Sequence, residues 1–170
     1  PAGERTSATQ AEYDESHVAR LRLIKALLEV GGLSVATANR VLAAVDSPFL
    51  PLSYVFGVAQ YAVSDASIYD PVADGSIGLA AVEEMIARRG WTVSADNPGR
   101  QGAARVLDTY ASLGHEHLSE ITEEYAAAAE LIARSDLAAV ARSQAVADMA
   151  ETVIVGTILG DRLIGSLRRM

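Results

Sequence analysis

Three groups of side chains in this sequence are of types that could do chemistry. The first is a set of cations, Arg20, Arg22 and Lys25, in a chain with only 14 lysine and arginine residues. Such a set can contact phosphate groups, or it can form the solvated face of a helix. Charge alone leaves both interpretations open.

The second and third groups are a histidine pair and an acidic run. His115 and His117 would diverge on a helix, and in a loop they are only a weak indication of metal binding. The acidic residues suit a solvated face and not paired acid–base catalysis, which needs burial to separate two pKa values: Glu120, Glu123, Glu124 and Glu130. We expect no catalytic residue, no metal site, no cofactor and no enzyme activity, so a small helical-bundle enzyme is the least favoured function.

Composition limits where the chain can act. With 170 residues, 50% of them hydrophobic, it can bury a real core, and without cysteine it has no disulfide or thiolate site. A net charge of −8 argues against a general nucleic-acid coat but leaves room for a local basic patch. The most apolar run, residues 153–159, is far shorter than the ~20 residues that cross a bilayer. We therefore expect a cytoplasmic protein with no membrane partner.

Residues 13–46 are predicted to form two amphipathic helices joined by a tight turn. Asp14 and Ser16 are suitable N-caps for the first helix, and Ser34 for the second. The Gly31–Gly32 pair ends the first helix, because glycine enters the left-handed conformation without steric cost. The apolar positions expected to face the core are Val18, Leu21, Leu23, Ile24, Leu27, Leu28 and Val30, then Val35, Ala38, Val41, Leu42 and Val45.

Pro48 and Pro71 bracket an aromatic segment in which we predict a helix over residues 53–62. Aromatic side chains are favoured both in interfaces and in cores. One face of this helix could therefore lie in an interface or pack on the C-terminal part of the same chain. That face carries Tyr54, Val58 and Tyr61.

From Ser76 onward we predict four helices with short connections, which make a small bundle and an all-α fold. They run from Ser76 to Gly90, from Asn97 to Gly114, from Ser119 to about Arg142, and from about Gln144 onward. Their expected apolar stripes are Leu79, Val82 and Ile86; Ala103, Val106, Leu107, Tyr110 and Leu113; Ile121, Tyr125, Ala128 and Ile132; and Met149, Val153, Ile158, Leu159 and Leu163.

Glycines recur in the last predicted helix, at Gly156, Gly160 and Gly165. Each costs about 0.5–1 kcal/mol relative to alanine, so we expect close packing of another helix or, less favoured, contact with a ligand. A candidate apolar pocket would combine this glycine face with large aromatic side chains. Its predicted lining is Trp91, Tyr110, Tyr125, Gly156 and Gly160.

The N-terminal quarter resembles the second half of a MerR-family DNA-binding domain, through the run ERTSATQAEYDESHVARLRLIKALLEVGGLSVATANRVLAAVD. The matching positions are Arg5, Thr6, Ser7, Tyr13, Asp14, Val18, Arg20, Leu21, Ile24 and the turn 31–34. The end of the chain, VIVGTILGDRLIGSLRRM, is more loosely similar to the final helical part of such regulators. Before Tyr13 the chain departs from the family, since Gln10, Ala11 and Glu12 stand where many members carry a phosphate-binding pair.

The resemblance implies a transcriptional regulator whose first helix-turn-helix lies before Pro1. This chain would then position the DNA reader by contacting the backbone, through Arg5, Thr6, Tyr13 and Arg20. The implied parts are residues 1–46 from the DNA-binding domain, residues 47–75 as a linker with a dimerisation helix, and residues 76–170 as an effector-binding or dimerisation domain. The implied partners are DNA, a second copy, RNA polymerase and a small apolar effector. The alternative is a helical dimerisation module without a ligand.

Overall fold

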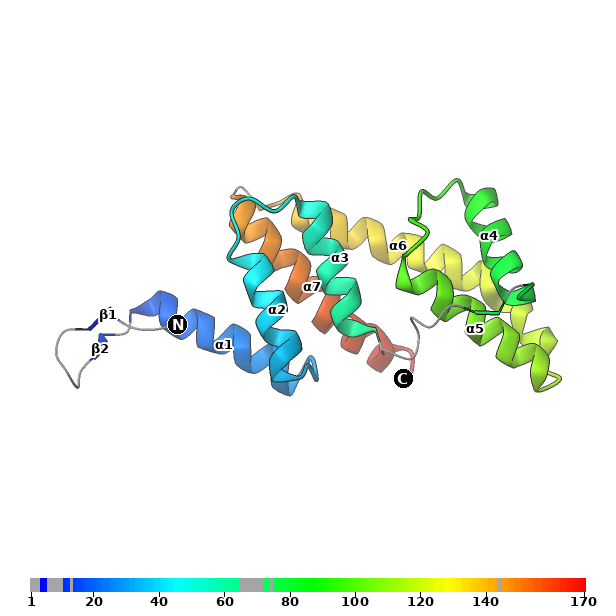
Figure 1. Ribbon diagram of the computed structural model, residues 1–170, viewed down its shortest axis with the longest axis horizontal. Helices are drawn as coiled ribbons and strands as arrows, with labels where there is room; N and C mark the ends of the chain where they lie inside the picture. The colour runs from blue at the N-terminus through cyan, green and yellow to red at the C-terminus, as the bar shows by residue number, and fades with distance from the viewer. Residues whose placement is uncertain (1–3, 6–10, 13, 65–71, 74, 144) are drawn as a thin grey trace. The chain divides into compact units, whose positions relative to one another are not determined.

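The structure, a computed structural model, describes residues 4–5, 11–12, 14–64, 72–73, 75–143 and 145–170. These ranges are helical apart from one short hairpin, which confirms the prediction of an all-α fold. In chain order the elements are β1 (Glu4–Arg5), β2 (Ala11–Glu12), α1 (Glu15–Glu29), α2 (Val35–Val45), α3 (Leu52–Val63), α4 (Ile77–Arg89), α5 (Pro98–Ser112), the 3-10 helix η2 (Glu116–Ile121), α6 (Thr122–Val140) and α7 (Val146–Leu167) (Figure 1).

Side-chain caps begin four of the helices, as their sequences predict. Asp14 caps α1 by accepting from the His17 amide at 3.1 Å. Ser34, Ser76 and Asn97 cap α2, α4 and α5 in the same way. These caps satisfy amide groups that have no partner within the helix, and so they fix where each helix starts.

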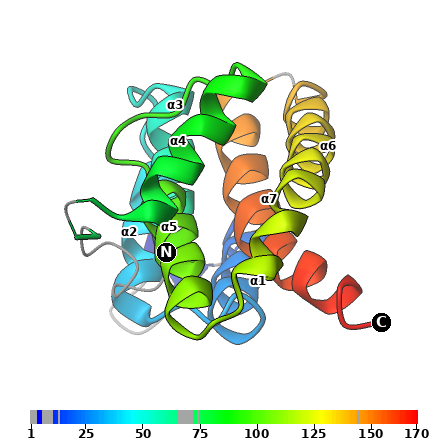
Figure 2. The same cartoon turned by 90° about the vertical axis from the view of Figure 1, so that its right-hand side faces the viewer.

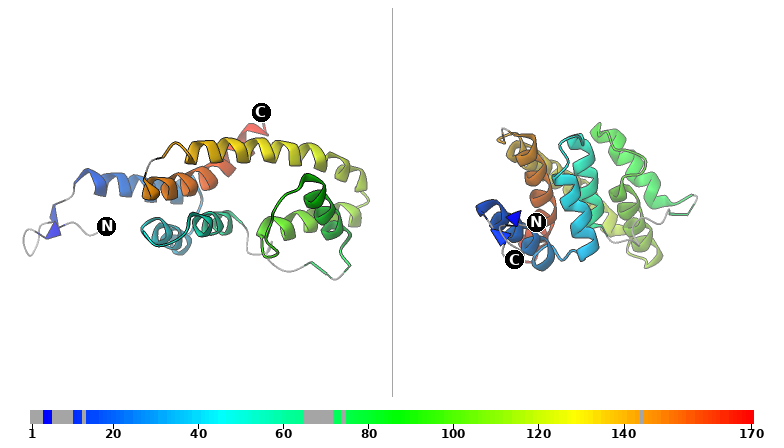
Figure 3. Two further views of the ribbon diagram at one scale, coloured as in Figure 1. Left: turned by 90° about the horizontal axis from the view of Figure 1, so that it is seen from above. Right: turned by 60° about the vertical axis from the view of Figure 1, so that its left-hand side comes forward.

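The contacts divide the chain into two compact units, which are described separately. Unit 1 comprises residues 1–63 and 140–170, and unit 2 comprises residues 64–139. This division differs from the predicted parts 1–46, 47–75 and 76–170, and it removes α7 from the predicted C-terminal bundle. The reason is that α7 packs against α1, α2 and α3, and its closest association is with α3 (Figure 3).

The core of unit 1 forms where four helices each present a stripe of apolar residues. In every stripe the side chains recur at intervals of three or four, so they share one helix face. The buried residues are Leu23 and Leu27 of α1, Val41, Leu42 and Val45 of α2, Val55 and Ala59 of α3, and Ala150, Val153, Ile154 and Ile158 of α7, with Val140.

Unit 2 is held by a close approach of α4 to α5 (Figure 2). A Cβ at Gly78 of α4 would collide with the backbone carbonyl of Ala104 on α5, so only glycine permits this spacing. Beside it, Asp108 of α5 accepts from the Ser76 hydroxyl at 2.6 Å and from the Gly78 amide at 2.8 Å. The start of α4 is therefore fixed to the middle of α5.

Several predicted core positions are wrong. On α1, Val18, Leu21 and Val30 are exposed, because the helix contacts α2 and α7 through the side that carries Leu23 and Leu27. On α2, Val35 is exposed as well. The sequence therefore showed a broad apolar stripe but not which of its residues other helices cover.

On the later helices, too, the buried residues differ from the predicted ones. The tight crossing at Gly78 buries Ala104, so Ala103 and Val106 of α5 are exposed, as is Leu113 just after the helix. At the end of η2, Ile121 is exposed, and on α6 Tyr125 is exposed and Ala126 is buried. On α7, Val153 and Ile158 are buried as predicted, but Leu163 is exposed because the packed part of the helix ends before it.

The glycines of α7 do not serve the close packing that the sequence suggested. Within the described part of the chain, a Cβ at Gly156 or Gly160 would meet no atom within 4 Å. At Gly165 it would lie 3.7 Å from the mobile end of the Arg169 side chain. Close approach in this protein depends instead on Gly78 and Gly31, which lie in other elements.

Candidate functional site

The chain begins with a small hairpin in the position of the predicted wing. β1 and β2 pair antiparallel, with Glu4 opposite Glu12 and Arg5 opposite Ala11. Of the predicted phosphate contacts, Arg5 lies in β1, whereas Thr6 and Tyr13 lie outside the described residues. In the sequence, the Asp14 cap of α1 follows two residues after Glu12, the end of β2.

The cap of α1 is a cluster of three polar side chains. The Asp14 carboxylate accepts from the Ser16 hydroxyl at 2.6 Å and lies 2.8 Å from the His17 ring nitrogen. The hydrogen bond from Ser16 and those from His17 hold the pKa of Asp14 far below its usual range. The carboxylate therefore stays charged next to the positive end of the helix dipole.

Arg20 has a role that the sequence did not suggest. Its guanidinium forms an ion pair with Asp46 and donates to the Leu42 carbonyl at 3.3 Å. Only 19% of the Arg20 side chain is exposed. Arg20 thus fastens α1 to the end of α2, and a phosphate contact through the same guanidinium would have to compete with this internal bond.

The turn between α1 and α2 is held from a distant part of the chain. The Arg162 guanidinium of α7 donates to the Gly31 carbonyl at 2.8 and 3.2 Å, across 131 residues of sequence. The Ile158 side chain lies so close to Gly31 that a Cβ there would be 2.7 Å from its Cγ2 atom. Gly32 then takes a φ of 71°, which favours glycine.

The contacts of Arg162 and Ile158 with Gly31 connect the turn between α1 and α2 to the last helix, α7. Ile158 is fully buried and belongs to the same core as Leu27. The position of α7 is therefore linked to the angle between α1 and α2. We could predict the glycine turn from the sequence, but nothing in the sequence indicates that Arg162 would bind it.

The predicted dimerisation residues lie on α3 and face two directions. Tyr54 is 54% exposed, and Tyr61 is exposed as well. Val58 is partly buried and packs against the core of unit 1. Because α3 packs on α7, packing within the chain is observed for this helix, whereas a dimer contact through Tyr54 and Tyr61 stays a prediction.

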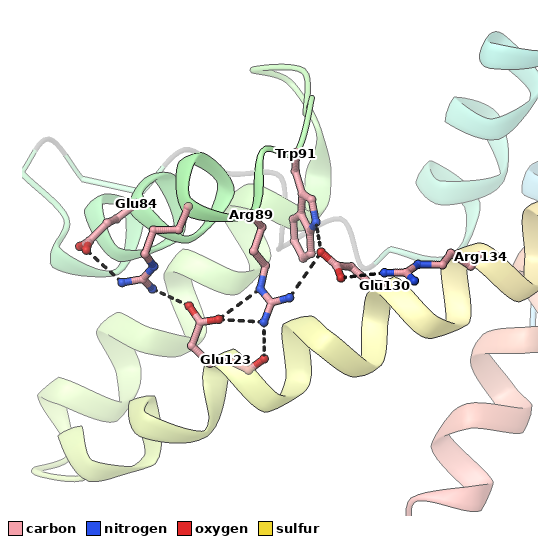
Figure 4. A network of polar contacts seen from close by, with 7 residues as sticks. Glu84, Arg89, Trp91, Glu123, Glu130 and Arg134 are labelled. Carbon is pink, nitrogen blue, oxygen red and sulfur yellow. Dashed lines mark hydrogen bonds and ion pairs between the residues drawn. The ribbon is translucent and has the colours of Figure 1, made fainter.

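Unit 2 contains a polar network around the only tryptophan of the chain (Figure 4). The Trp91 indole donates to Glu130 at 2.7 Å, and the Arg89 guanidinium lies 5.8 Å from the indole ring centre. Arg89 also donates to the Glu123 carboxylate at 2.8 and 3.2 Å and to the Glu123 carbonyl at 2.9 Å. These contacts fasten the end of α4 and the following segment to α6.

The charged groups of this network stabilise one another in their ionised forms. Hydrogen bonds from Arg89 lower the pKa of Glu123, and the hydrogen bond from Trp91 lowers the pKa of Glu130. The Glu123 carboxylate in turn raises the pKa of Arg89. The interpretation of Glu123 and Glu130 as part of a purely solvated acidic face is therefore wrong. Their spacing of seven residues places both on one side of a helix, which could have indicated a shared partner.

The predicted pocket residues are distributed over the two units. Trp91, Tyr110 and Tyr125 belong to unit 2, whereas Gly156 and Gly160 belong to unit 1. The space beside both glycines is open, and Trp91 is engaged by Arg89 and Glu130. Their use as a common pocket stays a prediction.

The histidine pair lies at the start of η2. His115 and His117 make an edge-to-face contact with 5.7 Å between ring centres. Among the described residues, no group of three or more histidine, aspartate or glutamate side chains is placed to bind a metal ion. In the same ranges no helix is both long and apolar enough to cross a membrane.

Comparison with known proteins agrees with the N-terminal geometry. Residues 1–45 match the family described as MerR HTH family regulatory proteins, and this match ends at the last residue of α2. Among solved structures, the chain is similar to the crystal structure of SCO5550, a proposed transcriptional regulator from Streptomyces coelicolor A3(2). The TM-score is 0.69 at 25% sequence identity, over 94% of this chain and 80% of that one. No curated protein matches the sequence.

The family match covers the hairpin, the capped helix α1 and the glycine turn that Arg162 holds. The structural similarity extends along nearly the whole chain, including the helices that follow. Over residues 1–45 this protein matches the MerR family, and the two similarities together support a transcriptional regulator of that family.

Proposed function

We propose that the protein couples a signal received by its helical part, a small molecule or a second copy, to the binding of promoter DNA. The observation that carries this proposal is the attachment of α7 to the α1–α2 turn through Ile158 and Arg162. A shift of α7 would displace the turn at Gly31. This displacement would change the angle between α1 and α2. An effector acts in this way only if it binds one arrangement better than the other.

In this proposal the chain positions a DNA reader and does not read bases. Major-groove readout needs an inserted helix or ribbon, which the resemblance assigns to a helix-turn-helix before Pro1. Arg5, Thr6 and Tyr13 are proposed to contact the DNA backbone. For Arg20 we propose a supporting role, since its guanidinium holds Asp46 and Leu42.

The test uses the protein together with its expected helix-turn-helix. Such a protein is incubated with a pool of random-sequence duplexes, and the bound DNA is sequenced after several rounds. We expect a sequence with twofold symmetry to be enriched, because two copies would read two half-sites. Ile158→Ala should weaken binding to that sequence, and Ala36→Gly, at an exposed position of α2, serves as a control. A pool that stays random would contradict the proposal.

A dimer is part of the proposal, and α3 supplies its contact through Tyr54 and Tyr61. We expect Tyr54→Glu to shift sedimentation of the protein toward the monomer. Tyr54 is about half exposed, so the change should leave the fold intact. The proposed place of action is the cytoplasm, where such a regulator would meet promoter DNA and RNA polymerase.

The second candidate function is a dimerisation module without a ligand, and one feature of α6 favours it. Leu131 is 67% exposed on this helix, and Leu137 is exposed too. Apolar side chains that together form an exposed patch often mark an interaction surface. If Leu131→Glu produces monomers and Tyr54→Glu does not, α6 is the dimer contact and this second function is favoured.

A further inference from the structure

A small cavity in unit 1 lies where the DNA-binding half meets the last helix. Its volume is about 140 Å³, and its lining comes from the end of α2, the α2–α3 connection, the start of α3 and the start of α7. Val45, Val55 and Ala150 are buried and form its floor. Asp46 and Ala147 also line it and are exposed, so they lie at its solvent side.

The chemistry of the cavity favours a compact apolar ligand. Most of the lining side chains are aliphatic, and the polar ones are Asp46 and Ser47. An apolar cavity of about 150 Å³ in another protein stays dry and binds benzene or xenon. The present cavity therefore has room for a molecule of about six non-hydrogen atoms.

A large aromatic side chain stands next to this cavity without an evident structural role. Phe49 is 92% exposed, and its chain neighbours Pro48 and Leu50 both line the cavity. A fully exposed phenylalanine forgoes the roughly 1.5–3 kcal/mol that burial of such a side chain provides. A ligand in the cavity would offer Phe49 an apolar surface to cover.

We propose that this cavity is a binding site for a compact apolar molecule, with an aromatic ring of benzene size as the best fit and Phe49 as its outer wall. Asp46 lines the cavity and also holds Arg20 of α1, while Ala150 belongs to α7. A ligand there would touch the start of α7 and also Asp46, the residue that holds Arg20 of α1. Its use as an effector site rests on the proposed function, whereas ligand binding itself does not.

The test is a titration of the 170-residue chain with benzene, followed by the NMR signals of its methyl groups. We expect saturable shifts at Val45 and Val55, while Val82 in the core of unit 2 does not move. Shifts that do not saturate, or equal shifts at Val82, would overturn the site. Xenon is the second probe, and it should move the same methyl groups.

Two variants and a control locate the ligand without disturbing the core. Ala147→Leu narrows the solvent side of the cavity and should weaken benzene binding about tenfold, which corresponds to about 1.4 kcal/mol. Phe49→Ala should weaken binding less, because it removes one wall only. Ala36→Leu, at an exposed position of α2 away from the cavity, is the control. Equal affinities for Ala147→Leu and Ala36→Leu would refute the assignment.

The proposed role of the cavity as an effector site is tested by a separate measurement of DNA affinity. Benzene should change the affinity of the protein with its helix-turn-helix for the enriched DNA, and Ala147→Leu should suppress this change. If benzene binds but the DNA affinity stays the same, the site stands and its effector role falls. If no DNA sequence is enriched at all, the proposed function fails while the benzene titration still decides the site.

Discussion

The Arg162 guanidinium donates two hydrogen bonds to the Gly31 carbonyl, at 2.8 and 3.2 Å. This carbonyl belongs to the turn that ends α1, where a backbone oxygen has no partner within the helix. Arg162 therefore acts as a cap supplied by a helix from the other end of the chain. Hydrogen bonds from Arg162 thus join the glycine turn between α1 and α2 to the last helix, α7.

Replacement of Arg162 should loosen this turn. We expect Arg162→Ala to lower the free energy of unfolding of the chain by about 1 kcal/mol, since a charge-assisted hydrogen bond is lost at a partly exposed site. The measurement is the urea midpoint followed by circular dichroism. Arg169→Ala removes the same charge from the same end of the chain, and an equal loss there would show that the Gly31 contact contributes nothing.

The ion pair between Arg20 and Asp46 should couple the two helices that it joins. In a double-mutant cycle with Arg20→Ala and Asp46→Ala we expect a coupling energy between about 0.2 and 1 kcal/mol, because Asp46 is largely exposed. The comparison pair is Lys25 and Glu29, which lie 3.8 Å apart with both side chains exposed. Its coupling should be near zero. Equal coupling in both cycles would contradict a special role for Arg20.

Gly78 should tolerate no larger residue. We expect Gly78→Ala to destabilise unit 2 by about 1–3 kcal/mol, since the added methyl group would collide with the Ala104 carbonyl. The fluorescence of Trp91, the only tryptophan, reports on unit 2 during unfolding in urea.

The matched control for Gly78 is a helical glycine with free space around it. Gly156→Ala should stabilise the chain by about 0.5–1 kcal/mol, because a Cβ there meets no atom within 4 Å and the helix gains propensity. If Gly156→Ala were instead destabilising, a close neighbour of that face would have to exist.

Unit 2 should lose stability in acid. The folded pKa of Glu123 lies below the usual 4.5, because Arg89 donates to its carboxylate, so this contribution is present above about pH 4.5 and is lost as pH falls through the folded pKa. Glu130 follows the same direction through Trp91, and Asp108 through Ser76. The measurement is the urea midpoint of Trp91 fluorescence between neutral pH and pH 3.

The variant Arg89→Met separates these contributions. It should reduce the pH dependence that comes from Glu123 and leave the part that comes from Asp108. Arg134→Met removes a largely exposed cation that pairs with Glu130 at 3.3 Å, and it should change the pH dependence little. A variant Arg89→Met that behaves like the unaltered protein at every pH would contradict the role of the network.

The sequence was informative wherever a structural feature depends on neighbouring residues. Caps, glycine turns and helix periods act within a few positions, so Asp14, Ser34, Ser76 and Asn97 could all be placed correctly. The same holds for the family resemblance, which rests on the order of residues around the first glycine turn.

Features that depend on distant partners could not be predicted in the same way. The identity of the covered face on α1 depends on where α7 lies, and α7 joins unit 1 from more than a hundred residues away. The glycines of α7 looked like packing sites because their number in a helix needs a reason, yet the close contacts occur at Gly31 and Gly78. Local pattern shows that a surface is apolar but does not show what covers it.

Unit 1 is built from two segments that lie far apart in the sequence. This determines the order in which the chain can finish folding during its synthesis. Leu27, Val41 and Val55 leave the ribosome long before Ile154 and Ile158, with which they share one core. Unit 2 is continuous in sequence and can fold in the meantime, while the earlier helices wait with their apolar faces uncovered. A nascent chain therefore completes the core that α1, α2 and α3 share only when its last helix has been made.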